Sequence, residues 1–199
     1  MVSQDPSAGG AGTEARVVIV SNRGPVSFSS GESGEREYSR GAGGLVTALN
    51  AVARRRSESV WIASAQSEED VLVAKENPDE PYEVEGLKVL LVEHDGETYD
   101  LMYNRLANPL LWFVQHGLYD LPYAPLLGDD TKRAWEKGYV PVNENFAEAV
   151  ARTLQAQEEG DAGEPVILVH DYQLYMTPLA LRKRLGDEAF ISLFVHIPW

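Results

Sequence analysis

The sequence predicts an α/β domain in which helices cover both faces of a mostly parallel β-sheet. Three apolar runs, at Val17–Val20, Val60–Ala63 and Val166–Val169, lack the polar alternation of a half-exposed strand, and segments with helical periodicity separate them. The chain has 199 residues, 44% hydrophobic and 24% charged, which suits one domain with a real core. We therefore expect one sheet whose parallel strands end at a common edge.

Strands and helices alternate through the first half of the chain. The strand at Val17–Val20 ends in the loop Ser21–Pro25, and Ser67 is a helix N-cap because three acidic residues follow it. That helix should end near Asn77. The other elements expected here are a hairpin over Val26–Tyr38, a helix over Leu45–Arg55, a strand over Val60–Ala63 and a strand over Lys88–Val92.

Two long helical segments precede the last strands. Thr98–His116 has helical periodicity with an interruption expected around Asn108–Pro109, and Pro141 should break a second helical segment over Asp130–Glu159. The chain then closes with a strand over Val166–Val169, a helix over Met176–Leu185 and a strand over Phe190–Val195.

Composition limits the classes of partner. Lys+Arg 17 against Asp+Glu 31 gives a net charge of −14, which disfavours nucleic acid and anionic membranes but leaves room for a small anion. The absence of cysteine excludes disulfides, thiolate catalysis and zinc–thiolate clusters. Residues 1–14 are rich in Gly, Ser and Ala, so we expect a disordered tail there rather than a signal peptide. With no apolar run near the roughly 18 residues of a membrane span, the expected location is the cytoplasm.

Two features near the first strand are candidates for binding an anion. Arg23 follows the strand, where an arginine can make a forked contact to phosphate; a plain surface arginine is the alternative. Gly41–Gly44 precedes a helix, and its backbone N–H groups could approach a phosphate or a sugar. A simple turn is an equally good interpretation of that glycine cluster.

Two later strands each have a histidine at their carboxyl end, where open α/β sheets bind ligands. Asp171, after His170, could accept a hydrogen bond from a sugar hydroxyl or could cap the following helix. A metal held by His170, Asp171 and His196 is conceivable, but their spacing does not indicate one, and we predict no metal. Because the chain stops soon after His196, we expect one half of a two-domain, ligand-clamping enzyme.

Other aromatic and histidine side chains are ambiguous from sequence. Trp112 and Tyr103 could form a platform for a sugar, although aromatic residues at helical spacing are more often part of a core. His116 is more typical of a packed helix histidine than of a catalytic base, and His94 of a turn residue.

Taken in order, several motifs together resemble the trehalose-6-phosphate synthase family over residues 16–199. They are Val18–Arg23, Gly41–Leu45, Tyr103–Asn104, Asn108–Trp112 with His116, His170–Leu174 and Phe194–Pro198. The resemblance implies a retaining glycosyltransferase with two Rossmann-like domains, the GT-B fold. Residues 15–199 would form the amino-terminal, acceptor-binding, doubly wound domain, and the carboxyl-terminal nucleotide-sugar domain would be absent.

The resemblance also implies site roles and partners. The donor would be UDP- or GDP-glucose, and the acceptor would be glucose 6-phosphate. The reaction would need no cofactor, and the full-length protein could form a homo-oligomer. Asp171 and His196 would be the catalytic residues. The implied contacts are Arg23 and Tyr103 on the acceptor phosphate, Trp112 beside the acceptor sugar, Asp171 on an acceptor hydroxyl, His196 on the donor glucose, and Gly43 and Gly44 on the donor diphosphate and sugar. Retention fits front-face attack, in which the leaving diphosphate takes the acceptor proton.

One departure leaves alternatives open. Ser64 stands where the family usually has a second tryptophan, and Trp61–Ala65 also resembles the validoxylamine 7′-phosphate synthase branch. A pseudo-glycosyltransferase is therefore one alternative, and a non-catalytic sugar-phosphate-binding module is another. We expect the chain alone to be inactive.

Overall fold

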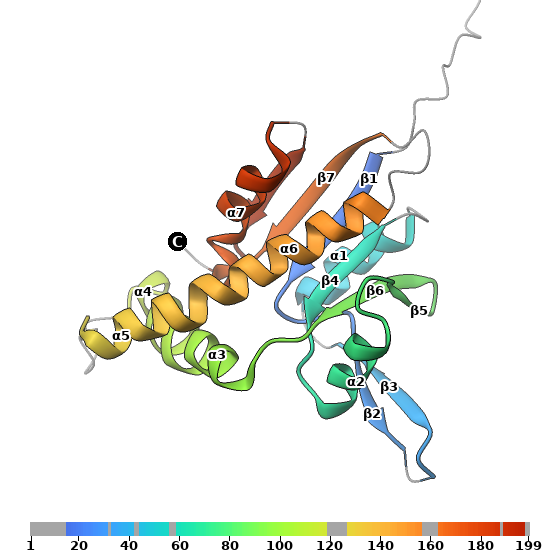
Figure 1. Cartoon of the computed structure of the whole chain (residues 1–199), viewed down its shortest axis with the longest axis horizontal. Coiled ribbons are helices and arrows are strands. Elements are labelled where there is room, and N and C mark those ends of the chain that lie inside the picture. Colours follow the sequence, from blue (N-terminus) through green and yellow to red (C-terminus); the bar gives the residue numbers. More distant parts are fainter. Residues whose placement is uncertain are drawn as a thin grey trace, which may run out of the picture.

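The computed structural model describes residues 15–31, 33–41, 44–55, 59–118, 127–156, 163–187 and 189–197. The expected tail over residues 1–14 lies outside them. The main sheet has six strands in the order β5-β6-β4-β1-β7-β8 (Figure 1). The strands are β1 (Ala15–Ser21), β4 (Val60–Ser64), β5 (Tyr82–Val84), β6 (Leu87–Val92), β7 (Gly163–His170) and β8 (Phe190–Phe194).

All pairings in this sheet are parallel except that of β5 with β6. The predicted doubly wound, mostly parallel sheet is therefore confirmed, with β5 as an antiparallel edge strand that the sequence did not predict. The chain builds outward from β1 to β4 and β6, and then returns to place β7 on the other side of β1. The order therefore reverses beside β1, which is where open α/β sheets bind ligands.

Alternate residues of β1 face opposite sides of the sheet. Val18 and Val20 belong to one core cluster, whereas Val17 and Ile19 belong to a second. The first cluster includes side chains from the long helical segments and from α7 (Thr177–Leu185), and the second includes side chains from α1 (Gly44–Arg55) and α2 (Glu68–Glu76). Both faces are thus covered, as the uniformly apolar strands predict.

The first long helical segment runs without a break. It consists of α3 (Gly96–Asp100), η1 (Leu101–Trp112) and α4 (Phe113–Gln115), and η1 has π-helical pairing. The expected interruption at Asn108–Pro109 is wrong. In an α-helix the ring of Pro109 would clash with the carbonyl four residues earlier, and the wider π turn leaves room for it.

The second long segment is also continuous. It consists of α5 (Asp129–Ala134), the π-helical η2 (Trp135–Tyr139) and α6 (Val140–Ala156), so the expected break at Pro141 is wrong too. Pro141 lies where π pairing changes to α pairing, and a residue without an N–H costs least where the hydrogen-bond register changes. Within the described ranges, no helix has the length and apolar character needed to cross a bilayer.

A two-stranded hairpin projects from the domain beside α2 (Figure 1). It consists of β2 (Val26–Ser30) and β3 (Arg36–Arg40), as predicted. Asp70, in the first turn of α2, anchors it: the carboxylate accepts from the backbone N–H of Phe28 at 2.7 Å and takes part in the capping box with Ser67. The predicted end of α2 is confirmed at Asn77.

Candidate functional site

The loop after β1 begins with a buried asparagine. Asn22 Oδ1 accepts hydrogen bonds from Ser64 Oγ at the end of β4 (3.1 Å) and from Tyr99 Oη on α3 (3.2 Å). Gln66 Nε2 donates to both Tyr99 Oη (3.1 Å) and the backbone carbonyl of Asn22 (3.2 Å). Ser64, Gln66 and Tyr99 thus fix the residue that directly precedes Arg23.

The side chain of Arg23 is exposed and reaches the long helix. Its guanidinium lies 3.4 Å from Tyr103 Oη on η1, and this hydrogen bond raises the pKa of Arg23 above its usual value. Tyr103 in turn stacks on Tyr99, with ring centroids 5.6 Å apart. The two phenol rings and the guanidinium therefore form one continuous polar and aromatic surface.

The same surface continues to the end of β7. Tyr172 Oη donates to Asn108 Oδ1 on η1 at 2.8 Å, and Asn108 also interacts with the side chain of Tyr103. Asp171 directly precedes Tyr172. The structure therefore brings Arg23, Tyr103 and Asp171 to one edge of the sheet.

Asp171 has a left-handed backbone conformation (φ 74°), which is uncommon for a residue other than glycine. Asp171 directly precedes η3 (Tyr172–Leu174), but its side chain makes no capping hydrogen bond, so the helix-cap alternative is wrong. Instead, Asp171 Oδ1 accepts from the backbone N–H of His196 at 2.9 Å, and the Asp171 N–H donates to the carbonyl of Phe194 at 2.9 Å. The backbone strain is therefore offset by contacts that join the ends of β7 and β8.

His170 and His196 face one another, with Nδ1 of the first 3.0 Å from Nε2 of the second. His170 is buried, and burial lowers its pKa to about 4, whereas His196 is exposed. In the part of the chain that the structure describes, no three His, Asp or Glu side chains form a group able to hold a metal ion. The short distance between the two histidine rings is therefore that of a hydrogen bond between them.

The remaining predicted residues lie in different settings. Gly43 is outside the described residues, and Gly44 opens α1 in open surroundings. Of the two glycines of this cluster that the structure describes, the packing requires Gly41, because a Cβ there would lie 2.6 Å from the carbonyl oxygen of Gly24. Trp112 is half-buried against the core and stacks on His116, with ring centroids 3.9 Å apart.

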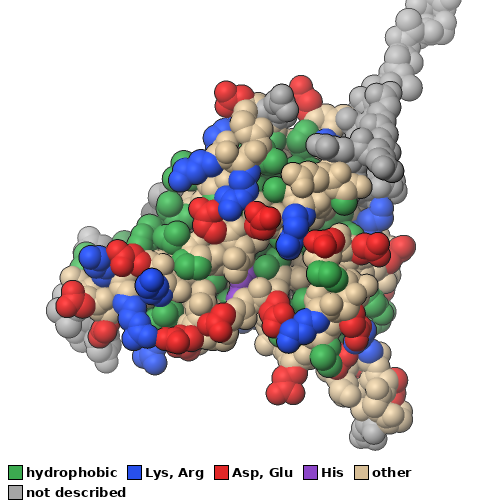
Figure 2. Space-filling view, in the orientation of Figure 1, with side chains coloured by type: hydrophobic (Ala, Val, Ile, Leu, Met, Phe, Trp, Pro, Cys, Tyr) green, Lys and Arg blue, Asp and Glu red, His purple; other side chains and the backbone are tan. Residues whose placement is uncertain are grey.

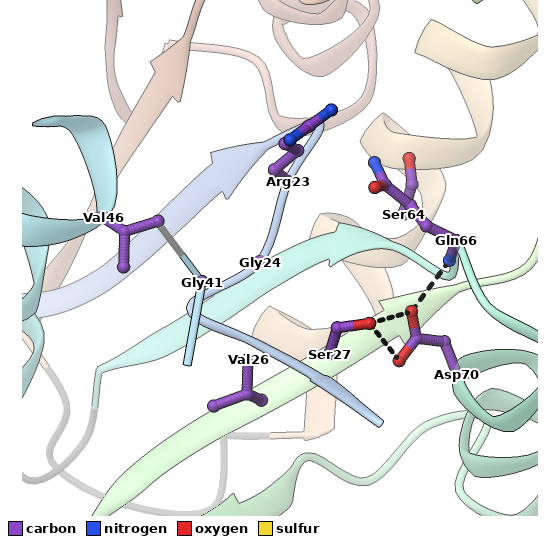
Figure 3. Close-up of a pocket in the computed structure, with 9 residues that line it drawn as sticks. All are labelled: Arg23, Gly24, Val26, Ser27, Gly41, Val46, Ser64, Gln66 and Asp70. Atoms are coloured by element: carbon purple, nitrogen blue, oxygen red, sulfur yellow. Dashed lines mark hydrogen bonds between the residues drawn. The ribbon is translucent and has the colours of Figure 1, made fainter. Parts of the chain in front are cut away.

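A small pocket of about 110 Å³ lies beside Arg23 (Figure 3). Asp70 forms one wall, where its carboxylate accepts from Ser27 Oγ (3.2 Å) and the backbone N–H of Gln66 (3.0 Å). Sequence reasoning missed Ser27 and Asp70, although the capping-box signal around Ser67 could have located Asp70. The full lining is Arg23, Gly24, Val26, Ser27, Gly41, Val46, Ser64, Gln66 and Asp70.

A doubly wound sheet with charged and polar side chains gathered where its strand order reverses defines a Rossmann-like, ligand-binding α/β domain. Comparison with known proteins gives the family. Residues 15–199 match the model of glycosyltransferase family 20, and the chain belongs to that family.

Three relatives illustrate the match. The chain is 33% identical over 193 residues to alpha,alpha-trehalose-phosphate synthase [UDP-forming] 1 of Aspergillus fumigatus, covering 94% of this chain and 33% of that protein. It superposes with a TM-score of 0.61 and 24% identity on an E. coli trehalose-6-phosphate protein bound with UDP-2-fluoro glucose, covering 93% of this chain and 34% of the other. A UDP-forming synthase from Burkholderia xenovorans in complex with glucose-6-phosphate gives a TM-score of 0.55 at 25% identity, covering 92% and 33%. The chain therefore spans about a third of the length of these relatives and has the fold of one GT-B domain.

Proposed function

We propose that this chain is the acceptor-binding part of a retaining glycosyltransferase that transfers glucose from a nucleotide-glucose to glucose 6-phosphate. Family membership supports the reaction type. The observation that carries the proposal is which groups the side chain of Arg23 contacts. Among the arginines whose side chains the structure describes, every other one contacts a carboxylate or a backbone carbonyl, whereas Arg23 contacts only the hydroxyl of Tyr103.

The contacts of Arg23 matter because the protein is strongly acidic, with 31 acidic residues against 17 basic ones. Under such a balance an arginine usually finds a carboxylate, so Arg23 is available to an external anion. Its guanidinium can donate two parallel hydrogen bonds to a phosphate, and Tyr103 Oη lies within reach of the same group. We assign the acceptor phosphate to this pair.

The acceptor sugar would extend from Arg23 toward Asp171. The Asp171 Oδ1 atom is occupied by the His196 N–H, which leaves Oδ2 to accept a sugar hydroxyl. Trp112 would flank the sugar ring. Asp171 and His196 would act as catalytic residues by holding the reacting groups, while the leaving diphosphate takes the acceptor proton.

The donor would lie across the same edge, with its diphosphate near Gly43 and Gly44 at the start of α1. The Aspergillus relative is named UDP-forming, which favours UDP-glucose over GDP-glucose. Because the chain spans about a third of that relative, we assign the remaining donor contacts to further sequence in a longer protein.

A cyclitol phosphate is the second candidate acceptor, and Ser64 is the observation that favours it. Ser64 is buried, and its Oγ is engaged by Asn22 and by His94 Nε2 (3.2 Å), so position 64 supplies a hydroxyl and not an indole to this side of the pocket. Gln66 and Asp70 make the neighbouring wall polar. Such a pocket is suited to a ring that carries extra polar groups.

The test is calorimetric titration of the chain with glucose 6-phosphate, glucose and validamine 7-phosphate. Loss of a charged hydrogen bond costs about 1.5–3 kcal/mol, so Arg23→Ala should weaken glucose 6-phosphate binding roughly 10- to 150-fold. Arg40→Ala, which removes an equal charge from the exposed Arg40–Glu85 ion pair, is the matched control and should bind like wild type. Equal losses in both variants, or glucose binding as tightly as glucose 6-phosphate, would contradict the phosphate assignment. Tighter binding of validamine 7-phosphate would favour the second acceptor.

A further inference from the structure

The two histidines at the ends of β7 and β8 make a contact that the proposed function leaves unused. His170 Nδ1 and His196 Nε2 are 3.0 Å apart, and the two ring centroids are 5.2 Å apart. His170 is 5% exposed, whereas His196 is exposed at the ligand edge. One side chain is therefore fixed by packing and the other is presented to a ligand.

A hydrogen bond at this distance needs one proton between the facing nitrogens, which allows two arrangements. If His196 Nε2–H is the donor, a neutral His170 must carry its own proton on Nε2. That atom is buried and has no hydrogen-bond partner within the described part of the chain. A buried N–H without an acceptor is rarer than an unfilled acceptor site, so the second arrangement is preferred, with the proton on His170 Nδ1.

We propose that His170 is a positioning residue that donates its Nδ1–H to His196 Nε2 and so fixes the tautomer of His196. A neutral imidazole carries one proton, and its position is set by the hydrogen bond that the other nitrogen makes. His196 is thereby held with its proton on Nδ1, free to donate to a ligand oxygen. The neutral side chain of free histidine in water prefers the opposite tautomer, with the proton on Nε2.

The surrounding contacts hold both partners in place. The Asp171 N–H donates to the Phe194 carbonyl, and Asp171 Oδ1 accepts from the His196 N–H, each at 2.9 Å. The backbone of His196 is thus fixed from β7, and so is its ring. Burial also keeps the pKa of His170 at about 4, so His170 remains a neutral donor near neutral pH.

The consequence for chemistry rests on the proposed function. A fixed Nδ1–H can donate to a hydroxyl of the transferred sugar or to an oxygen of the leaving diphosphate, both of which are acceptors. With the other tautomer, His196 would present a lone pair, which can accept from a sugar hydroxyl but repels a diphosphate oxygen.

The test is nitrogen-15 NMR of the histidine side chains in the 199-residue chain without any sugar nucleotide, because the shifts of Nδ1 and Nε2 report which nitrogen carries the proton. We expect the Nδ1–H tautomer for His196 in wild type and a change to Nε2–H in His170→Leu, which removes the donor. His170→Asn keeps an amide donor close to the position of Nδ1 and should keep the wild-type tautomer.

His94 serves as an internal reference. Asn145 Nδ2 lies 3.3 Å from its Nδ1 and Ser64 Oγ 3.2 Å from its Nε2, so its proton should stay on Nε2 in all three proteins. An Nε2–H tautomer for His196 in wild type would overturn the proposal, whatever happens to the variants. So would an unchanged His196 tautomer in His170→Leu with the His94 signals intact. Neither result would bear on the assignment of phosphate to Arg23, so the two proposals fail separately.

Discussion

At the scale of single residues, a half-buried histidine connects the helices to the start of the ligand loop. His94 follows β6, stacks on Tyr99 at 5.6 Å between ring centroids and bonds Ser64, which bonds Asn22. Asn145 donates to His94 Nδ1, so the His94 proton lies on Nε2 and is donated to Ser64. The series of hydrogen bonds from Asn145 through His94 and Ser64 therefore runs in one direction and ends at Asn22 Oδ1. The sequence predicted only that His94 is a turn residue, because nothing local reveals partners that are 30 and 51 positions away.

The environment of His94 predicts how the stability of the protein depends on pH. Burial lowers the pKa of His94 from 6.5 to about 4. Above pH 6.5 the imidazole is neutral in both states. Between pH 6.5 and about 4 only the unfolded chain takes up the proton, so the stability from burying the neutral ring is lost as the pH falls through this window. At pH 5 we expect the loss to be on the order of 1–2 kcal/mol.

Urea unfolding of wild type and His94→Gln at pH 7.5 and pH 5 measures this effect. The variant should show a smaller fall in unfolding free energy between the two pH values, by the amount given above. His170 has a similarly lowered pKa and remains in both proteins, so its contribution cancels in the comparison. Equal pH dependence in the two proteins would show that His94 is protonated as readily in the folded as in the unfolded state.

At the scale of elements, a close approach of the two π-helical segments shapes the wall of the site. A Cβ on Gly138 in η2 would lie 2.6 Å from both the Leu101 Cβ and the Met102 backbone nitrogen in η1. Backbone cannot move aside as a flexible side chain can. This contact therefore sets the position of η1, which carries Tyr103, Asn108 and Trp112.

Gly138→Ala should destabilise the protein by about 1–3 kcal/mol or more, because the added methyl group overpacks a backbone contact. Gly96→Ala is the matched control. A Cβ at the start of α3 meets nothing within 4 Å, and alanine is a better helix former, so no loss of stability is expected there. Urea midpoints measure both changes, and a Gly138→Ala variant as stable as Gly96→Ala would show that η1 and η2 are not in tight contact.

The elements also show how far sequence reasoning reaches. The strands, the hairpin and the Ser67 cap follow from local patterns of hydrophobicity and capping, and these predictions are confirmed. The helix breaks predicted at Pro109 and Pro141 are wrong because the rule assumes α pairing, and both prolines lie in or beside π segments. The strand β5 was missed because three residues carry too little pattern.

For the site, the sequence predicted the edge at which its residues lie but not the contacts that hold them. The rule that parallel strands end at one edge predicted that Arg23, Asp171 and His196 would lie on one side of the sheet. It did not predict the contacts that hold them, such as those of Gln66, Tyr99 and His170, because those contacts form only when distant elements pack. The roles of the predicted residues in binding and transfer remain predictions.

At the scale of the whole molecule, the arginines whose side chains the structure describes contact carboxylates or backbone carbonyls, with the exception of Arg23. Figure 2 shows acidic and basic side chains intermixed across the face that includes α6. Pairs such as Arg184–Glu144 (2.6 Å) and Arg36–Glu69 (2.7 Å) neutralise these arginines locally. The net charge of −14 would repel anions at long range, so an anion should bind only where a local cation and neutral donors meet. Arg23 and Tyr103 form such a place.

The most direct test of this account is a crystal structure of the chain with bound glucose 6-phosphate. We predict that the phosphate lies within hydrogen-bonding distance of the Arg23 guanidinium and Tyr103 Oη, and that the sugar ring extends toward Asp171. A phosphate bound away from Arg23, or a sugar ring directed away from the end of β7, would contradict the proposed acceptor site.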